Sequence, residues 1–315
     1  MSETPDVSVP ASERTVAAML PRESVRSVYI DMVYCPDGPV ATKGSELREL
    51  ATGTAFFYES DGANYLITAW HNVTGKHPET GEYLGEYAVS PTHFRLTFLA
   101  PPPTEAGWQL TASPGNPTTA QVQMPISQYL LPLLREDWSP AWLEHPALGK
   151  SMDVVALSLA RLPARTVLSR WNEPRTGVDM SQEIEWPRLS AGADVFIVGF
   201  PYRISTGPFL PLWIRGTIAS EPTFGHMRNG EILPLMLVDA RTRKGQSGSP
   251  VIRHVPMRQF VIAKDGKPGL STGNHSELVG VYSGRTSDES DLGFVWFVDQ
   301  IDEIVKQDRE DSSVD

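Results

Sequence analysis

The stretch R-K-G-Q-S-G-S-P-V-I, residues 243–252, places Ser247 in a G-x-S-G pattern directly before an apolar segment. Glycine permits a tight turn here, and such a turn can direct two backbone N–H groups into one concavity. A concavity of this kind binds the oxyanion that forms when a serine attacks a carbonyl carbon. Because glycine and serine are also common in ordinary turns, the stretch alone indicates either a nucleophilic serine or a structural turn.

Short segments rich in β-branched and aromatic residues recur along the chain between Gly, Pro, Asn and Asp, a pattern typical of strands. They cover residues 24–34, 53–58, 64–70, 94–100, 153–159, 194–200, 212–219, 233–240, 249–255, 277–284 and 293–298. Asp-Gly pairs at 59–64 and 263–269 favour hairpins. The chain is therefore predicted to be all-β. It does not match the G-x-S-x-G elbow of α/β-hydrolases, because position 249 is serine and the strands do not alternate with helices.

Helical periodicity is confined to two places. Near the C-terminus, Phe297, Ile301 and Ile304 or Val305 recur at helical spacing, which predicts an α-helix there. A second stretch with helical character, residues 127–138, is interrupted by Pro132. The predicted fold is thus mostly β with a C-terminal α-helix.

Composition narrows the function classes. The 315 residues carry a net charge of −11, the wrong sign for binding nucleic acid or an anionic membrane. No run reaches the roughly 18 apolar residues that a membrane-spanning helix needs. The single cysteine, Cys35, can form no internal disulfide, and the acidic start of the sequence does not resemble a signal peptide. We expect a cytoplasmic protein with neither nucleic-acid nor membrane partners.

The length corresponds to about two domains, and a polar, Pro-containing stretch divides the strands into two sets. The expected organisation is a disordered tail at 1–22, a first β unit at 23–165 with a Pro-rich surface insertion at 100–121, a connection at 166–190, a second β unit at 191–298, and a helix end with an acidic tail at 299–315.

Two further residues are of the types that act together with a nucleophilic serine. His71 directly follows the segment N-Y-L-I-T-A-W, and Asp153 opens the segment D-V-V-A-L-S-L, so the chain order is His, Asp, Ser. A histidine beside a serine can act as its general base, and a carboxylate can orient that histidine. The structural alternatives are a buried histidine satisfied by backbone groups and an aspartate that only caps a strand.

The motifs G-T-A-F-F, L-I-T-A-x-H, D-V-V-A-L, V-G-F-P, G-x-S-G-S-P-V and L-V-G-V-Y-S-G together resemble trypsin-like serine peptidases over residues 50–298. The likeness is greatest to the disulfide-poor bacterial branch that includes glutamyl endopeptidases. The resemblance implies two six-stranded antiparallel β-barrels of the chymotrypsin kind, with the active site in the cleft between them. It also implies that Ser247 is the nucleophile, His71 the general base and Asp153 its orienting carboxylate.

The resemblance assigns further roles. The N–H groups of Gly245 and Ser247 would form the oxyanion hole, and Ser283 and Gly284 match the segment on which such enzymes pair an extended substrate. Two-chain activated members have aspartate where this sequence has Gln246, so that activating ion pair is not expected. Tyr282 stands where glutamyl endopeptidases have a pocket histidine, so a preference for glutamate is not implied.

Arg241 stands six residues before the serine, where trypsin-type pockets have a carboxylate for basic substrates. A preference for Lys or Arg is therefore not expected. Arg241 either favours an acidic residue before the cleaved bond or is a surface side chain with a solvated head.

The sequence predicts a serine endopeptidase that hydrolyses protein substrates through an acyl-enzyme and uses no cofactor. The remaining histidines lack metal-ligand spacing, so no metal site is expected. Two alternatives stay open: a catalytically silent, protease-like module that binds peptides, and a protease held inactive until a partner orders the turn at Gly245. Gln246 and the lack of an obvious pro-segment fit the second alternative.

Overall fold

A computed structural model describes most of the chain. The described residues are 22–42, 44–99, 111–113, 116–121, 126–163, 166–173, 184–207, 209–228, 230–271, 273–287 and 289–308. The secondary structure is mostly strand with few helices, so the predicted all-β class with a C-terminal helix is confirmed. None of the described helices is long and apolar enough to cross a membrane.

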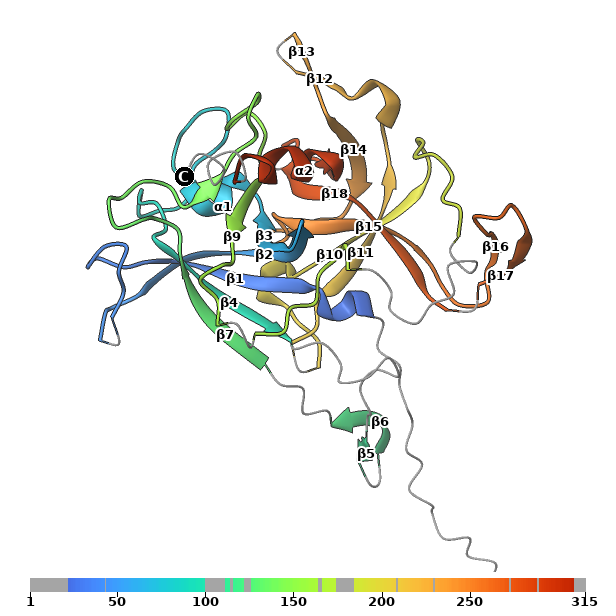
Figure 1. Cartoon of the computed structure of the whole chain (residues 1–315), viewed down its shortest axis with the longest axis horizontal. Coiled ribbons are helices and arrows are strands. Elements are labelled where there is room, and N and C mark those ends of the chain that lie inside the picture. The colour runs from blue at the N-terminus through green and yellow to red at the C-terminus, as the bar shows by residue number, and fades with distance from the viewer. Residues whose placement is uncertain are drawn as a thin grey trace, which may run out of the picture.

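The first unit is a seven-stranded antiparallel sheet with the order β7-β4-β1-β2-β3-β9-β8 (Figure 1). Its strands are β1 (Ser27–Tyr34), β2 (Arg48–Ser60), β3 (Ala63–Thr68), β4 (His93–Leu99), β7 (Ile126–Pro132), β8 (Trp142–Leu143) and β9 (Val155–Ser158). The β2–β3 hairpin closes through Asp61 and Gly62, both of which have positive φ, as the Asp-Gly pair predicts.

The second unit is a closed antiparallel barrel with the order β10-β11-β14-β19-β18-β15. Its strands are β10 (Asp194–Gly199), β11 (Leu212–Ile218), β14 (Leu235–Ala240), β15 (Ser249–Val255), β18 (His275–Arg285) and β19 (Leu292–Phe297). The first sheet thus takes its strands from residues 27–158 and the barrel from residues 194–297.

Smaller elements complete the described structure. Two-stranded hairpins are formed by β5 (Thr111–Ser113) with β6 (Asn116–Gln121), β12 (His226–Arg228) with β13 (Glu231–Leu233), and β16 (Phe260–Ile262) with β17 (Pro268–Leu270). The α-helices are α1 (Trp70–Thr74) and α2 (Asp299–Val305), and 3-10 turns cover Arg22–Val25, Pro201–Arg203 and Pro222–Phe224. The β16–β17 hairpin flanks the second Asp-Gly turn, as predicted.

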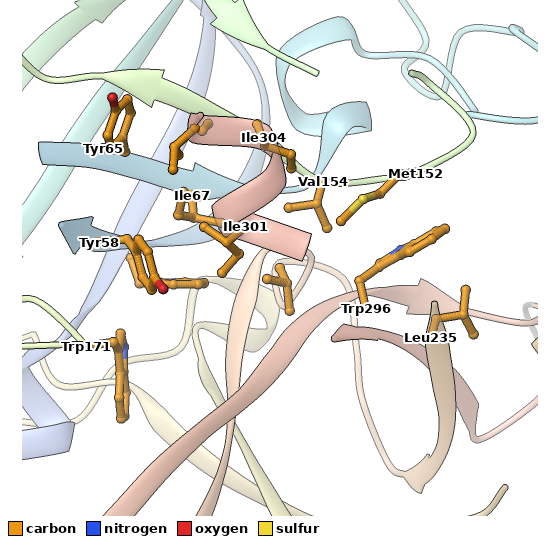
Figure 2. Close-up of a cluster of buried hydrophobic side chains, with 14 of the residues drawn as sticks. Tyr58, Tyr65, Ile67, Met152, Val154, Trp171, Leu235, Trp296, Ile301 and Ile304 are labelled. Carbon is orange, nitrogen blue, oxygen red and sulfur yellow. The ribbon is translucent and has the colours of Figure 1, made fainter. Parts of the chain in front are cut away.

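A buried apolar cluster joins the two units (Figure 2). The first sheet contributes Ile67, the barrel contributes Trp296, and Ile301 and Ile304 enter from α2. Helix α2 contacts β9 and β19, so it lies where the two units meet (Figure 1). Burial of the apolar face of α2 explains why a charged C-terminal segment is helical and held in place.

All eleven predicted strand segments contain strands, but the helical character expected at 127–138 is wrong. Residues Ile126–Pro132 form β7, which pairs with β4 from Leu99↔Ile126 to His93↔Pro132. Pro132 stands at the end of this edge strand, where its missing N–H costs no ladder bond. Pairing with β4 therefore overrides a weak local helical pattern.

Several expected segments lie partly outside the described residues. Only residue 22 of the expected tail is described, and of the insertion at 100–121 only the backbone of β5 and β6 is described. Residues 174–183 of the expected connection and the acidic end at 309–315 also lie outside the described residues. The expected domain boundaries stay predictions.

Candidate active site

His71 and Asp153 lie at the same edge of the first sheet because the strands they adjoin are neighbours. β3 and β9 pair antiparallel, with Thr68 opposite Val155. His71 follows the end of β3 in the first turn of α1, and Asp153 precedes the start of β9. In an antiparallel pair the end of one strand meets the start of the other, so the ladder itself brings the two side chains together.

The two side chains are bonded to each other. Asp153 Oδ2 lies 2.8 Å from His71 Nδ1 and Oδ1 lies 3.1 Å from it. The His71 backbone N–H also donates to Asp153 Oδ1, at 3.0 Å. A carboxylate on Nδ1 favours the tautomer with its proton there, which leaves Nε2 as a proton acceptor.

The packing of the residues on either side of Asp153 fixes its position. Met152 and Val154 are both fully buried and belong to the cluster shared by the two units (Figure 2). On the histidine side, the Trp70 indole N–H donates to Glu144 Oε1 at 2.8 Å, which ties α1 to the segment next to β8. The hydrogen bonds of the His71–Asp153 pair therefore lie within the first unit, while the residues on either side of Asp153 pack in the cluster shared with the second unit.

Ser247 lies in the turn that connects β14 to β15. The turn is closed by reciprocal bonds: Gln246 N–H donates to Arg243 O at 3.2 Å, and Arg243 N–H donates to Gln246 Oε1 at 2.8 Å. Ser249 N–H then donates to Gln246 O at 2.9 Å. The side chain of Gln246 is fully buried, so its acceptor oxygen fixes the turn from inside.

Positions 245 and 248 need glycine for two reasons: the backbone has a positive φ, and there is no room for a Cβ atom. Gly245 has φ +98°, and a Cβ there would collide with Phe200 O. Gly248 has φ +85°, and a Cβ there would collide with Thr54 O. The G-x-S-G pattern thus reflects a turn pressed against other backbone segments.

Other segments hold the carbonyl groups of this turn. Tyr202 N–H donates to Lys244 O at 2.7 Å, and the Thr54 hydroxyl donates to Gly245 O at 2.7 Å. Ser247 O accepts from Thr54 N–H at 2.9 Å and from Asn72 Nδ2 at 3.0 Å. Each carbonyl from Arg243 to Ser247 therefore has a donor within the protein.

Two N–H groups of the turn, unlike its carbonyls, have no hydrogen-bond partner in the described structure. Within the described structure, the backbone N–H groups of Gly245 and Ser247 have no acceptor. In a trans peptide the C=O and N–H point in opposite directions, so with Lys244 O bonded to Tyr202 the Gly245 N–H points away from that contact. With its carbonyls engaged, the turn presents two free donors, the arrangement that binds an anion.

The serine and the histidine come from different units but lie close together. Asn72, the residue after His71, donates to the carbonyl of Ser247. Ser247 is half-buried, and in the described structure no hydrogen bond links its hydroxyl to His71. Hydrogen bonds of this kind often tighten only when substrate binds.

The other predicted site residues lie in three different settings. Ser283 is 3 % exposed and accepts from the Trp296 indole at 3.2 Å, whereas Gly284 is half-buried, and a Cβ added to it would meet nothing within 4 Å. Tyr282 is 2 % exposed and packs inside the barrel. Arg241 is exposed and lines a surface depression with Asp194 at the start of β10 and with residues of β11 and β14.

The Tyr282 hydroxyl lies 2.5 Å from Thr242 Oγ1, at the start of the serine turn. Burial raises the pKa of Tyr282 to about 12, so its phenol stays neutral and able to donate. The ring therefore supports the turn from within the barrel rather than lying at the surface.

Sequence reasoning missed the residues that hold the turn: Thr54, Asn72 and Tyr202. The motifs G-T-A-F and T-A-W-H-N contain the first two, so a signal was present, but their partners are far away in sequence. Among the described residues, no group of three His, Cys, Asp or Glu side chains is placed to hold a metal ion.

Comparison with known proteins gives two findings. The family described as Trypsin-like peptidase domain matches residues 53–255. Among solved structures, the Rv3671c protease of M. tuberculosis in its active form is 16% identical with a TM-score of 0.38, covering 97% of this chain and 91% of that chain. An inactive form of a Rv3671c mutant is 14% identical with a TM-score of 0.37, covering 95% and 93%. No curated protein matches the sequence.

Proposed function

The chain belongs to the trypsin-like peptidase family, and we propose that it is a serine endopeptidase in which Ser247, His71 and Asp153 form the catalytic triad. One observation carries this proposal. A histidine bonded through Nδ1 to a carboxylate lies beside a serine turn that presents two free backbone N–H groups. These are the parts that acyl transfer to a serine requires.

In the first half-reaction, Ser247 Oγ attacks the carbonyl carbon of the peptide bond and its proton passes to His71 Nε2. The resulting imidazolium gives that proton to the leaving nitrogen as the carbon–nitrogen bond breaks, which leaves an ester on Ser247 and a free amine. In the second half-reaction water repeats the sequence: His71 takes a proton from water and returns it to Ser247 Oγ as the acid leaves.

Asp153 keeps His71 in the required tautomer and stabilises its charged form. Both carboxylate oxygens lie within 3.1 Å of Nδ1, and one of them also accepts the His71 backbone N–H. The ring therefore has little freedom to rotate away from the serine. Removing the charge while keeping the shape in such a pair costs about 10⁴-fold in kcat.

The N–H groups of Gly245 and Ser247 would hold the oxyanion. In related sites each donor contributes about 3 kcal/mol to the transition state. Such donors are effective only when their direction is fixed before the reaction, and in this turn every neighbouring carbonyl is already bonded.

An open strand edge beside Ser247 supports a protein substrate. β15 pairs with β18 only from Val255↔His275 to Ser249↔Tyr282, while β18 continues to Arg285. β15 therefore offers no residue opposite Ser283 and Gly284. An extended peptide can add to this edge as a further strand, with its scissile bond next to Ser247.

The two competing functions make different predictions. A partner-gated protease should have a turn whose carbonyls lack donors until the partner binds, whereas here all of them have donors within the chain. A silent peptide-binding module would bind extended peptides without cutting them, and this alternative is decided by turnover.

The test uses an unfolded protein as substrate, since every peptide sequence is then accessible. The purified chain is incubated with a reduced and alkylated protein, and products are sequenced by mass spectrometry, with Ser247→Ala as the control. We expect new internal cleavage sites that the variant does not produce. Binding of the unfolded protein without cleavage that depends on Ser247 would overturn the proposal in favour of the binding module.

A further inference from the structure

Thr54 makes four hydrogen bonds, and two of them connect the first sheet to the serine turn. It lies in β2 and is fully buried. Its N–H donates to Ser247 O at 2.9 Å, and its hydroxyl donates to Gly245 O at 2.7 Å. Its hydroxyl also accepts from Phe200 N–H at 3.2 Å, and its carbonyl accepts from the Thr68 hydroxyl at 2.8 Å.

The two bonds to the turn flank the peptide that carries one oxyanion donor. The Ser247 N–H belongs to the Gln246–Ser247 peptide, which lies between the carbonyls of Gly245 and Ser247. Thr54 therefore fixes the peptides on both sides of it, and the bond from Ser249 N–H to Gln246 O holds the Gln246–Ser247 peptide itself.

The hydrogen bond with Phe200 connects Thr54 to the segment that orients the second donor, the Gly245 N–H. Phe200 precedes the 3-10 turn Pro201–Arg203, and Tyr202 in that turn holds Lys244 O at 2.7 Å. The Lys244–Gly245 peptide carries the Gly245 N–H. One hydroxyl group thus contacts both segments that orient the two donors.

The space around this hydroxyl fits its role. A Cβ at Gly199 would lie 2.8 Å from Thr54 Oγ1 and would collide with Ser249 Oγ. The glycine of the V-G-F-P motif therefore makes room for the Thr54 hydroxyl at the junction between β2, β10 and β15.

We propose that Thr54 is a positioning residue that sets both oxyanion donors across the two units, so that the turn is competent before substrate binds. The inference rests on the proposed serine peptidase function and names Thr54 as the residue that aligns the turn. The first unit supplies the triad base, and through Thr54 it also sets the geometry of the part of the site that belongs to the second unit.

The test replaces Thr54 with valine, which keeps the shape and the backbone N–H but removes the hydroxyl. Two readouts are used: the rate of labelling by a fluorophosphonate probe, and kcat and KM for p-nitrophenyl acetate. We expect labelling rate and kcat to fall about 10- to 100-fold while KM changes by less than about threefold, because alignment and not binding is lost. Thr54→Ser, which restores a hydroxyl, should recover most of the rate.

Thr92→Val is the matched control. Thr92 is also buried in the first unit, and its hydroxyl accepts the Cys35 N–H at 2.8 Å, but it does not touch the turn. We expect both threonine variants to lose stability, and only Thr54→Val to lose labelling rate. Thr54→Ala, which removes the hydroxyl without adding volume, serves if the valine variant does not fold.

The outcomes separate the two proposals. Equal labelling rates for folded Thr54→Val and Thr92→Val, in a protein whose wild type is labelled at Ser247, would overturn the role of Thr54 alone. Failure of Thr54→Ser to recover the rate would also overturn it. A folded wild type that is not labelled at Ser247 would overturn the proposed function, and the role of Thr54 with it.

Discussion

The two halves of the candidate site are held in different ways. The His71–Asp153 half is built within one sheet, because β3 and β9 are neighbours and both side chains follow from that ladder. The serine half lies in a turn of the other unit, and its carbonyls at Gly245 and Ser247 are held by Thr54 from the first sheet. The hydrogen bonds of one half are local to its sheet, and those of the other cross between the two units.

This difference indicates which changes should act at a distance. A change that loosens the docking of the two units should misalign the oxyanion donors while the histidine keeps its carboxylate. A change at the His71–Asp153 edge should remove the base and leave the turn intact. Substitutions in each half test this division, and the largest effect is expected at Ser247, the proposed nucleophile.

Ser247→Ala removes the proposed nucleophile and should lower kcat by about 10⁴- to 10⁶-fold. Its hydroxyl makes no hydrogen bond among the described residues, so the free energy of unfolding should change by less than about 0.5 kcal/mol. Ser249→Ala is the matched control, because Ser249 Oγ is buried without a partner in the described structure. Peptide cleavage and urea unfolding check both variants. Equal losses of activity in the two would show that Ser247 is not the nucleophile.

Asp153→Asn affects only the half that is local to the first sheet. It should lower kcat by about 10⁴-fold, because an amide no longer favours the tautomer with Nε2 unprotonated. Asp194→Asn is the control: Asp194 is exposed and pairs with Arg215, so its loss should leave kcat within about twofold. Steady-state kinetics with a cleaved peptide decide between them. Comparable losses would show that Asp153 has no special role.

Gly245→Ala affects only the serine half. The positive φ and the contact with Phe200 O force the turn to move, so kcat should fall about 10²- to 10³-fold with KM little changed. Gly266→Ala provides the control, because Gly266 also has positive φ (+79°) but nothing within 4 Å of an added Cβ. Kinetics and thermal unfolding separate strain from misalignment. If kcat for Gly245→Ala matched that of the control, the turn would not be the oxyanion-binding site.

The smallest effect is expected away from both halves. Burial raises the pKa of Asp31, although the Tyr29 hydroxyl donates to it at 2.9 Å and opposes the shift. A raised carboxyl pKa means that the folded protein holds this proton more tightly than the unfolded chain. The resulting stability is present below pH 3.8 and is lost as pH rises through the folded pKa.

The unfolding free energy of the wild type relative to Asp31→Asn should therefore fall as pH rises from about 4 to 7. Urea unfolding of both proteins across this range measures it, and peptide cleavage should be the same in both. A difference that rises with pH would contradict the sign, and a loss of cleavage would show that the site depends on more than its two halves.

Much of this site could be predicted from local sequence. Strand periodicity places His71 after one strand and Asp153 before another, and the G-x-S-G pattern marks the serine turn. Those three positions depend on patterns only a few residues long. The eleven strand segments were predictable for the same reason.

The rest depends on contacts that no local pattern encodes. Thr54 reaches the turn only because β2 packs against the second unit, and β7 is a strand only because β4 pairs with it. The surroundings of Arg241 are likewise not visible in the sequence: it is exposed beyond the end of β14, between the buried Ala240 and Thr242.

The most direct test of the account is labelling of the purified, folded protein by a fluorophosphonate probe, compared with Ser247→Ala and His71→Ala. The probe needs an activated serine and an oxyanion site but no knowledge of the substrate. We predict one label on Ser247 in the wild type without any added partner, and none in either variant. A folded wild type that takes up no label, or a label that persists in Ser247→Ala, would contradict the claim that the two units assemble a working serine peptidase site.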